Sequence, residues 1–283
     1  MSYNYFKYHA LGNDYIVIDP NNSGINLNTE NIKLICHRNF GIGSDGILYG
    51  PIFNEKEIGL KILNPDGSEA EKSGNGIRIF SKYLLDAGYI KDRKFSLNTL
   101  GGKVAVEVLD AKGQLIKVDM GVVTFLSNEI PVDGKPREVI NEVLEIDNKN
   151  LKITCLSIGN PHCVIPMVEI SEDIVKLIGP EIENNPIFPN RINVQLLKVL
   201  DRNNIQIEIW ERGAGYTLAS GSSSCAAASA AFKLGLVDNE IKVHMPGGVI
   251  EVDIKNDGHV LMTGSVNSVS KGVFTEEFWM DIT

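Results

Sequence analysis

The chain has 283 residues, 43% of them hydrophobic and 22% charged, an ordinary composition for a globular protein that excludes a disordered or fibrous one. Its formal net charge is −9, and lysine and arginine are scattered along the chain, so it lacks the basic patch of a protein that binds nucleic acid or an anionic membrane. We therefore expect its partner to be a small molecule.

The N-terminal stretch and the cysteines indicate the compartment. The opening sequence MSYNYFKYHALGNDY lacks the basic and apolar regions of a signal peptide, and no stretch approaches the roughly 20 apolar residues that span a bilayer. The four cysteines include no C-x-x-C pair, which argues against a zinc site and against a disulfide framework. We expect a cytoplasmic protein without a metal site, whose thiols are reduced and mostly buried.

The first half of the chain contains strand patterns and two helix patterns. β-branched or alternating apolar residues predict strands over 14–19, 58–64 and 95–109. Apolar residues at helical spacing after a threonine cap predict a helix over 29–39. The apolar segment 76–88, which follows a Gly-Asn-Gly turn, is expected to be a buried helix.

The second half repeats this order of elements. Strands are expected over 156–168, 191–200 and 204–212, with a helix over 171–182. After a second glycine-rich turn, the small and apolar segment 223–235 predicts another buried helix. Because a helix that is apolar on most faces needs a sheet wrapped around it, we expect two curled sheets, each around one central helix.

A fixed offset of 147 residues relates the two halves. It carries three landmarks of the first half onto the second: Ser73 onto Ser220, Gly12–Asn13 onto Gly159–Asn160, and Asn64 onto Glu211. We interpret the halves as a duplicated fold. The segment 120–150 has the proline, glycine and charge content of a crossover between them. We therefore expect one domain over 1–121, joined by a returning strand over 266–283, and a second domain over 122–265.

The two serines each precede a predicted helix. A helix start presents unpaired N–H groups and a partial positive charge, and it binds anions. If both helix starts hold one carboxylate, Ser73 and Ser220 flank the same carbon, as removal and return of a proton on opposite faces requires. The simpler interpretation of either serine is a helix N-cap, and the Gly-Asn pairs and the Glu211–Arg212 pair could be an ordinary turn and strand end.

Six motifs identify a family that this chain resembles. In order and spacing, HALGNDYIVID, FGIGSDGI, NPDGSEAEKSGNGIRIF, GNPHCV, RINVQ and ERGAGYTLASGSSSCAAA are similar to the diaminopimelate epimerase family over nearly the whole chain. The resemblance implies an α/β fold of two pseudo-symmetric domains, each a curled, mostly antiparallel sheet around a central helix. It also implies a homodimeric, cofactor-independent epimerase of amino-acid (lysine) biosynthesis.

The same resemblance implies roles for individual residues. It places Asn13, Asn64, Asn193 and Arg212 at the distal end of diaminopimelate, where Arg212 faces a second carboxylate. It places Gly74, Asn75, Gly221 and Ser222 at the reacting carboxylate, with Asn160 nearby. His162 and Glu211 correspond to polar groups that assist at the reacting end.

The chain departs from this family at the reacting positions. The family has a cysteine at both places where this chain has Ser73 and Ser220, and a serine hydroxyl does not titrate in the range where a thiol can work. Cys225 lies five residues into the helix and is no replacement. Tyr216 stands where the family usually has glutamate.

Three interpretations of the departure stay open. In the first, both cysteines were replaced to trap an inactive epimerase. Alternatively, a natural relative runs other chemistry, as a double-bond isomerase, a dehydratase or a different racemase, with His162 or Glu211 as the base and the serines as hydrogen-bond donors. Finally, the chain binds an amino acid without catalysis. The independent change at Tyr216 favours a natural relative.

Overall fold

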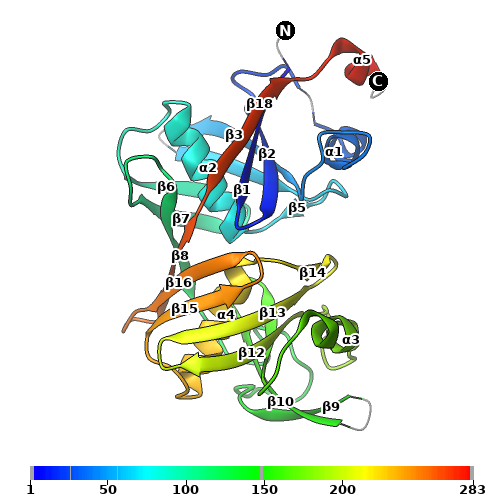
Figure 1. Ribbon diagram of the computed structural model, residues 1–283, viewed down its shortest axis with the longest axis vertical. Coiled ribbons are helices and arrows are strands. Elements are labelled where there is room, and N and C mark those ends of the chain that lie inside the picture. The colour runs from blue at the N-terminus through cyan, green and yellow to red at the C-terminus, as the bar shows by residue number, and fades with distance from the viewer. Residues whose placement is uncertain (1–2, 26, 56, 147–148, 281–283) are drawn as a thin grey trace. The chain divides into compact units, whose positions relative to one another are not determined.

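The chain forms two compact units in the computed structural model, which describes residues 3–25, 27–55, 57–146 and 149–280 (Figure 1). The first unit consists of Met1–Val118 and Gly264–Thr283, and the second of Asp119–Thr263. The boundaries expected from the sequence lie a few residues further along the chain. In the part of the chain that is described, no helix is long and apolar enough to cross a membrane.

The first unit is built on a sheet with strand order β18–β1–β2–β3–β4–β6–β7–β8, in which β5 also pairs with β4. The pairs β2–β3 and β4–β6 are parallel, and the other pairs are antiparallel. The strands are β1 (Asn4–Ala10), β2 (Asn13–Ile18), β3 (Ile47–Asn54), β4 (Glu57–Leu63), β5 (Glu69–Ala70), β6 (Lys94–Thr99), β7 (Gly102–Val108), β8 (Leu115–Val122) and β18 (Asn267–Val273).

The helix α2 (Gly74–Asp86) is the core of the first unit. Every residue from Gly74 to Leu84 is buried, and the helix contacts β1, β2, β3 and β7. Figure 1 shows it inside the curl of these strands. The helix α1 (Thr29–Cys36) packs apolar side chains on the same unit, and α5 (Glu276–Met280) ends its described part.

The second unit has the strand order β10–β11–β12–β13–β15–β16–β17, with β9 on β10 and β14 on β13. Only β11–β12 and β13–β15 are parallel among these described pairs. The strands are β9 (Glu142–Ile146), β10 (Lys149–Ser157), β11 (Pro161–Pro166), β12 (Asn193–Asp201), β13 (Asn204–Glu211), β14 (Gly215–Thr217), β15 (Glu240–Met245), β16 (Gly248–Ile254) and β17 (His259–Ser265).

The helix α4 (Gly221–Lys233) takes the central place in the second unit. It contacts β10 to β13, β15 and β16, and its alanine and serine side chains are small enough to let these strands approach closely. The helix α3 (Glu172–Glu183) packs against β12, β13 and β14 after the N-cap Ser171.

The backbone of the two units repeats in register. α2 begins at Gly74 and α4 at Gly221, which are 147 residues apart (221 minus 74). The parallel pairing of Ile16 with Ile47 recurs, at the same offset, as that of Cys163 with Val194. This confirms the predicted fold class, two pseudo-symmetric units that each wrap a mostly antiparallel sheet around one helix.

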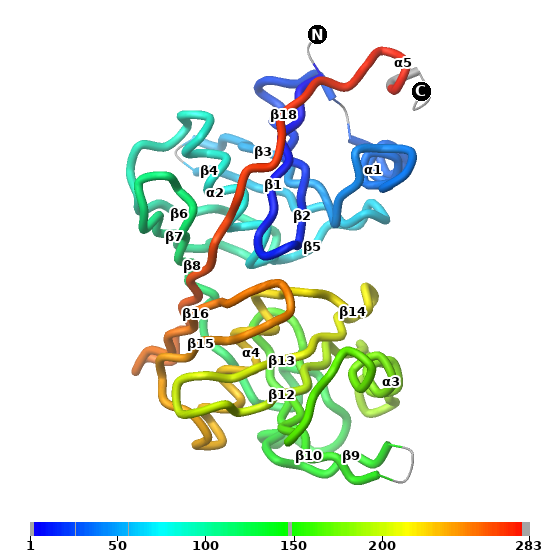
Figure 2. Tube along the Cα trace, viewed as in Figure 1, coloured from blue at the N-terminus to red at the C-terminus, as the bar shows by residue number. Residues whose placement is uncertain are grey.

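Three local predictions were wrong. The buried helices begin two residues earlier than expected, because their first turn consists of the glycine-rich residues themselves. The N-cap of α1 is Asn28, whose side chain accepts from the Asn31 N–H, and not the threonine after it. In the C-terminal segment, only Asn267–Val273 returns as a strand beside β1 (Figure 2), whereas Glu276–Met280 is helical. Residues 281–283 lie outside the described residues.

Candidate active site

The start of α2 is capped by the first of the two serines. The Oγ of Ser73 accepts a hydrogen bond from the Gly76 N–H at 3.0 Å, and it lies 3.3 Å from the hydroxyl of Tyr15 on β2. A Cβ on Gly76 would lie 3.0 Å from Leu48 and 3.3 Å from this Oγ, so glycine allows the close packing of the turn. As at any helix start, the first N–H groups have no intrahelical partners, and the Ser73 side chain satisfies that of Gly76.

A network of amides fixes the side chains beside this helix start. The Nδ2 of Asn75 donates to the Oδ1 of Asn13 at 3.0 Å, and the Nδ2 of Asn13 donates to Asp45 at 2.8 Å. The guanidinium of Arg78, which is fully buried, donates to the Asn75 Oδ1 and to the Gly74 carbonyl. The structure therefore brings together the predicted residues Asn13, Gly74 and Asn75.

Asn64 lies in a turn at the same edge of the sheet. Its Nδ2 donates to the Oγ of Ser68 at 2.9 Å, and its carbonyl accepts from the Gly67 N–H. The register pairs Ile16 with Ile47 and Ile47 with Leu63, so the start of β2 and the end of β4 share one sheet edge. Asn64, directly after β4, and Asn13, the first residue of β2, thus lie at the same sheet edge. No described hydrogen bond joins the two.

The start of α4 carries the second serine. The Oγ of Ser220 accepts from the Ser223 N–H at 3.4 Å and lies 3.5 Å from the Oγ of Ser222. The Nδ2 of Asn160 donates to the same Ser222 hydroxyl at 3.4 Å. Gly221 is the first residue of the helix, so the predicted residues Asn160, Ser220, Gly221 and Ser222 lie together.

His162 supports this group from the interior. Its Nε2 lies 2.9 Å from the Oδ1 of Asn160, and its side chain is fully buried. Burial, together with a smaller effect of the positive charge of Arg212, lowers the pKa of His162 to about 3. A neutral imidazole of this pKa is a weak base. This argues for a role in fixing Asn160 and against the general base considered from the sequence.

Asn193 and Arg212 meet at the sheet edge of the second unit. The Oδ1 of Asn193 accepts from the backbone N–H of Arg212 at 2.9 Å, and its Nδ2 donates to the Pro161 carbonyl. The exposed guanidinium of Arg212 donates to the carbonyl of Asn190, and within the described residues it forms no ion pair. It is therefore available to an anionic ligand. Glu211, half-buried, is the neighbouring residue at the end of β13.

The change at Tyr216 has a local structural explanation. Its hydroxyl donates to the Oε2 of Glu208 at 3.1 Å, and the ammonium of Lys176 lies 5.0 Å from its ring centre. Burial raises the pKa of the Glu208 carboxyl, which a phenol donor partly offsets. Tyr216 thus belongs to the packing of β13, β14 and α3.

No cysteine replaces the missing thiols in this structure. All four cysteines are buried, and Cys225 lies inside α4. Among the described residues, no group of three or more histidine, cysteine or acidic side chains could hold a metal ion.

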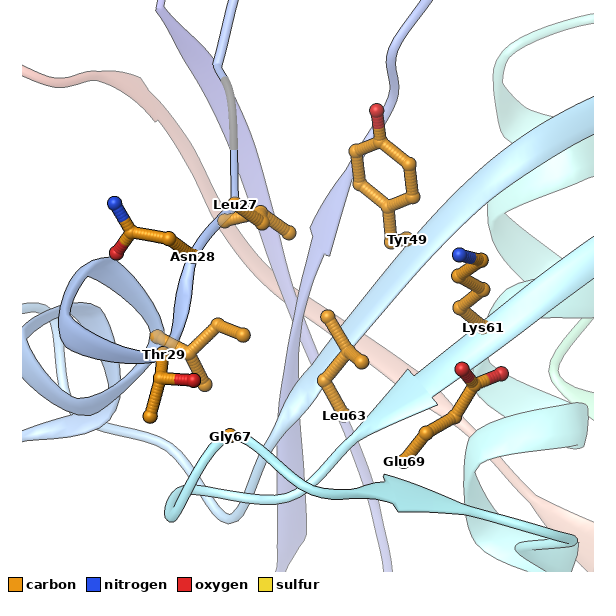
Figure 3. A pocket seen from close by; sticks show the side chains of 9 residues that line it. Leu27, Asn28, Thr29, Tyr49, Lys61, Leu63, Gly67 and Glu69 are labelled. Atoms are coloured by element: carbon orange, nitrogen blue, oxygen red, sulfur yellow. The ribbon is translucent and has the colours of Figure 1, made fainter.

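A cavity in the first unit lies apart from these residues. It has a volume of about 370 Å³ and lies between α1 and the strands β4 and β5 (Figure 3). Its lining includes Leu63, Lys61 and Glu69 but none of the predicted site residues. Gly67 connects its lining to the site residues, because its N–H donates to the Asn64 carbonyl.

The structure also adds residues that the sequence analysis did not single out. Tyr15, Asp45 and Arg78 all touch predicted site residues. Tyr15 and Asp45 lie in motifs of the family resemblance, HALGNDYIVID and FGIGSDGI, which could have drawn attention to them.

Comparison with known proteins gives consistent matches. The family model described as diaminopimelate epimerase matches residues 5–126 and 154–269. The chain is 55% identical over 276 residues to "Diaminopimelate epimerase 2" of Nostoc sp., covering 97% of this chain and 96% of that protein. It is 38% identical over 281 residues to "Diaminopimelate epimerase" of Methanothermobacter thermautotrophicus, covering 96% of this chain and 98% of that protein.

Among solved structures, the fold is similar to a probable proline racemase from Agrobacterium radiobacter K84 with bound carbonate. The TM-score is 0.71 at 14% identity, and the match covers 96% of this chain and 93% of that one. At this identity the likeness concerns the fold alone.

Proposed function

Since the chain belongs to the diaminopimelate epimerase family, as its motifs predicted, and is an isomerase of the cofactor-independent amino-acid epimerase type, we propose that it epimerises a free amino acid with a second carboxylate. Diaminopimelate is the first candidate, because the similar proteins carry it in their names. We further propose that the protein acts as a homodimer in the cytoplasm.

One observation carries this proposal: two central helices begin in the same register, each directly after an N-cap serine. Such a start offers N–H groups and a partial positive charge to a carboxylate. Holding the carboxylate there stabilises the negative charge that develops when the adjacent carbon loses its proton. We propose that the starts of α2 and α4 both take part in this proton transfer.

The polar side chains suggest how the substrate is held. Gly74, Asn75, Gly221 and Ser222 are proposed to bind the reacting carboxylate, with Asn160 beside them. Arg212 is proposed to bind the distal carboxylate, since its guanidinium is exposed and forms no ion pair in the described chain. The remaining proposed contacts to the distal end are made by Asn13, Asn64 and Asn193.

The serines determine the expected rate. Ser73 and Ser220 occupy the positions from which protons would be removed and returned, but a hydroxyl is a far weaker acid than a thiol. We therefore expect slow turnover by this protein. Glu211 is the carboxylate closest in sequence to Arg212 and is proposed to assist at the reacting end.

The experiment that tests this proposal is exchange of the α-proton in deuterated water. The protein is incubated with candidate amino acids, diaminopimelate included, and the α-proton signal is followed by NMR. We expect exchange with an amino acid that has two carboxylates. Absence of exchange with every candidate would overturn the proposal, and tight binding by calorimetry in that case would indicate a noncatalytic amino-acid binder.

A further inference from the structure

The hydroxyl of Tyr15 lies beside the first of the two serines, where the function proposed above assigns it no role. The phenolic oxygen is 3.3 Å from the Oγ of Ser73, and the Tyr15 side chain is 7% exposed. Gly46 permits the close approach of the ring, because a Cβ there would lie 2.8 Å from the Tyr15 Cε1. The Tyr15 ring thus packs closely against the backbone of Gly46.

The hydrogen-bond capacity of Ser73 gives this contact a direction. A serine oxygen accepts two hydrogen bonds and donates one. The Gly76 N–H occupies one acceptor position of Ser73. The geometry allows either hydroxyl to donate, and because a phenol is a much stronger acid than an alkyl hydroxyl, we assign Tyr15 as the donor to the second position. The Ser73 O–H is then left to donate away from the helix.

We propose that Tyr15 is a positioning residue that enables Ser73 to deliver a proton to the substrate carbon, an inference that rests on the function proposed above. The O–H bond of Ser73 breaks as its proton forms the new Cα–H bond. The Tyr15 proton moves to the Ser73 oxygen in the same step, and the negative charge remains on a phenolate. The charge thereby avoids the serine alkoxide, which is the less stable anion.

The second unit lacks this arrangement at the equivalent place. The residue 147 positions after Tyr15 is His162, which contacts Asn160 at 2.9 Å. The Ser220 Oγ instead lies 3.5 Å from another serine hydroxyl, that of Ser222. The two serines therefore have different neighbours, and only Ser73 contacts a phenol among the described hydrogen bonds.

Tyr8 provides a matched control inside the same unit. It pairs with Tyr15 across β1 and β2, and its side chain is 3% exposed. Its hydroxyl donates to Asp86 at the opposite end of α2, away from Ser73. A Tyr8→Phe variant removes a buried phenolic hydroxyl from the neighbouring strand without touching the proposed relay.

The first test does not depend on activity. A Ser73→Cys variant places a thiol at this position, and the native cysteines are buried and poorly reactive. A hydrogen bond from Tyr15 stabilises the thiolate, so its fraction at pH 7 should be about tenfold larger than in Ser73→Cys/Tyr15→Phe. Ser73→Cys/Tyr8→Phe should titrate like Ser73→Cys. Equal titration of all three variants would overturn the proposal.

The second test measures exchange of the α-proton. Tyr15→Phe should lower kcat at least about tenfold while KM stays within about twofold, and Tyr8→Phe should change neither. The loss should shrink when Ser73 and Ser220 are both replaced by cysteine, because a thiol needs no phenol to transfer a proton. Equal kcat for Tyr15→Phe and the unmodified protein would overturn the role of Tyr15. Exchange by neither would instead overturn the proposed function, and the thiol titration would still decide on the contact.

Discussion

The starts of α2 and α4 have the same backbone but different surroundings. Both helices begin after a serine whose Oγ accepts the N–H three residues later, and both units share the strand register behind it. At the first start lie the phenol of Tyr15, beside Ser73, and the buried guanidinium of Arg78, which donates to the Gly74 carbonyl. Around the second lie small hydroxyls and a neutral imidazole.

The two units share the backbone of the helix start but differ in the side chains around it. The anion-binding feature belongs to the backbone of a helix start, so it is present in both units whatever the side chains are. The proton chemistry belongs to side chains, and these differ. A reaction that takes a proton from one face of a carbon and returns it to the other can use two unlike partners, and the following predictions test this difference.

The largest expected effect comes from placing a thiol at both serine positions. Replacing both Ser73 and Ser220 by cysteine should raise epimerisation at least about 100-fold, because each thiol titrates in the working range and supplies the acid or base that the other needs. Either single replacement should give much less, since one thiol lacks its partner. Chiral analysis of the product measures the rate. A double variant no faster than the single ones would contradict the prediction.

Acid should weaken the second unit through His162. Its pKa is about 3 in the folded protein and ordinarily about 6.5, so the unfolded chain binds the proton more readily. The stabilisation is complete above pH 6.5 and is lost as the pH falls toward 3, by roughly 3 kcal/mol between pH 7 and pH 4. Urea unfolding of the protein and of His162→Gln over this range measures it. Parallel pH dependences for the two proteins would contradict the assignment.

The guanidinium of Arg212 should distinguish ligands by their second carboxylate. Arg212→Ala should weaken binding of a dicarboxylic amino acid by about 2 kcal/mol and leave a monocarboxylic one unchanged. Arg202→Ala is the control, because Arg202 is an exposed arginine of the same unit that already pairs with Asp238. Calorimetry gives both affinities. An unchanged affinity for the dicarboxylic ligand would mean that Arg212 does not bind it.

Much of this comparison could be predicted from the sequence, because it depends on regular features. The 147-residue offset, the order of strands and the central helices follow from periodicity and from repeated glycines. Gly88 and Gly235 even end the two helices alike, both with positive φ. The helix starts are expected two residues too late, since Gly-Asn-Gly has the composition of a turn, whereas in the structure it forms the first turn of the helix, with Ser73 as the N-cap of the Gly76 N–H.

The side-chain environment of each serine could not be predicted in the same way. Tyr15 and Ser73 are 58 residues apart, and their contact depends on how β2 packs on α2. The buried position of Arg78 depends on amide and carbonyl oxygens that only the folded chain presents. From the sequence, Tyr216 is only a departure from the glutamate usual in the family. Its hydrogen bond to Glu208 depends on the pairing of β13 with β14.

The smallest expected effect separates the capping role of the serines from their chemical role. Ser73→Ala and Ser220→Ala should each lower the free energy of unfolding by about 1 kcal/mol, and replacement by glycine by only a few tenths. Ser171, the N-cap of α3, makes the same type of bond with the Ile174 N–H at 3.3 Å and lies outside the proposed site. Ser171→Ala should therefore cost about as much stability without affecting exchange of the α-proton. If all three alanine variants lose the same stability and the same activity, capping alone explains the serines. If exchange falls only in Ser73→Ala and Ser220→Ala, their hydroxyls take part in the reaction, and the larger of the two losses identifies the face whose proton transfer limits the rate.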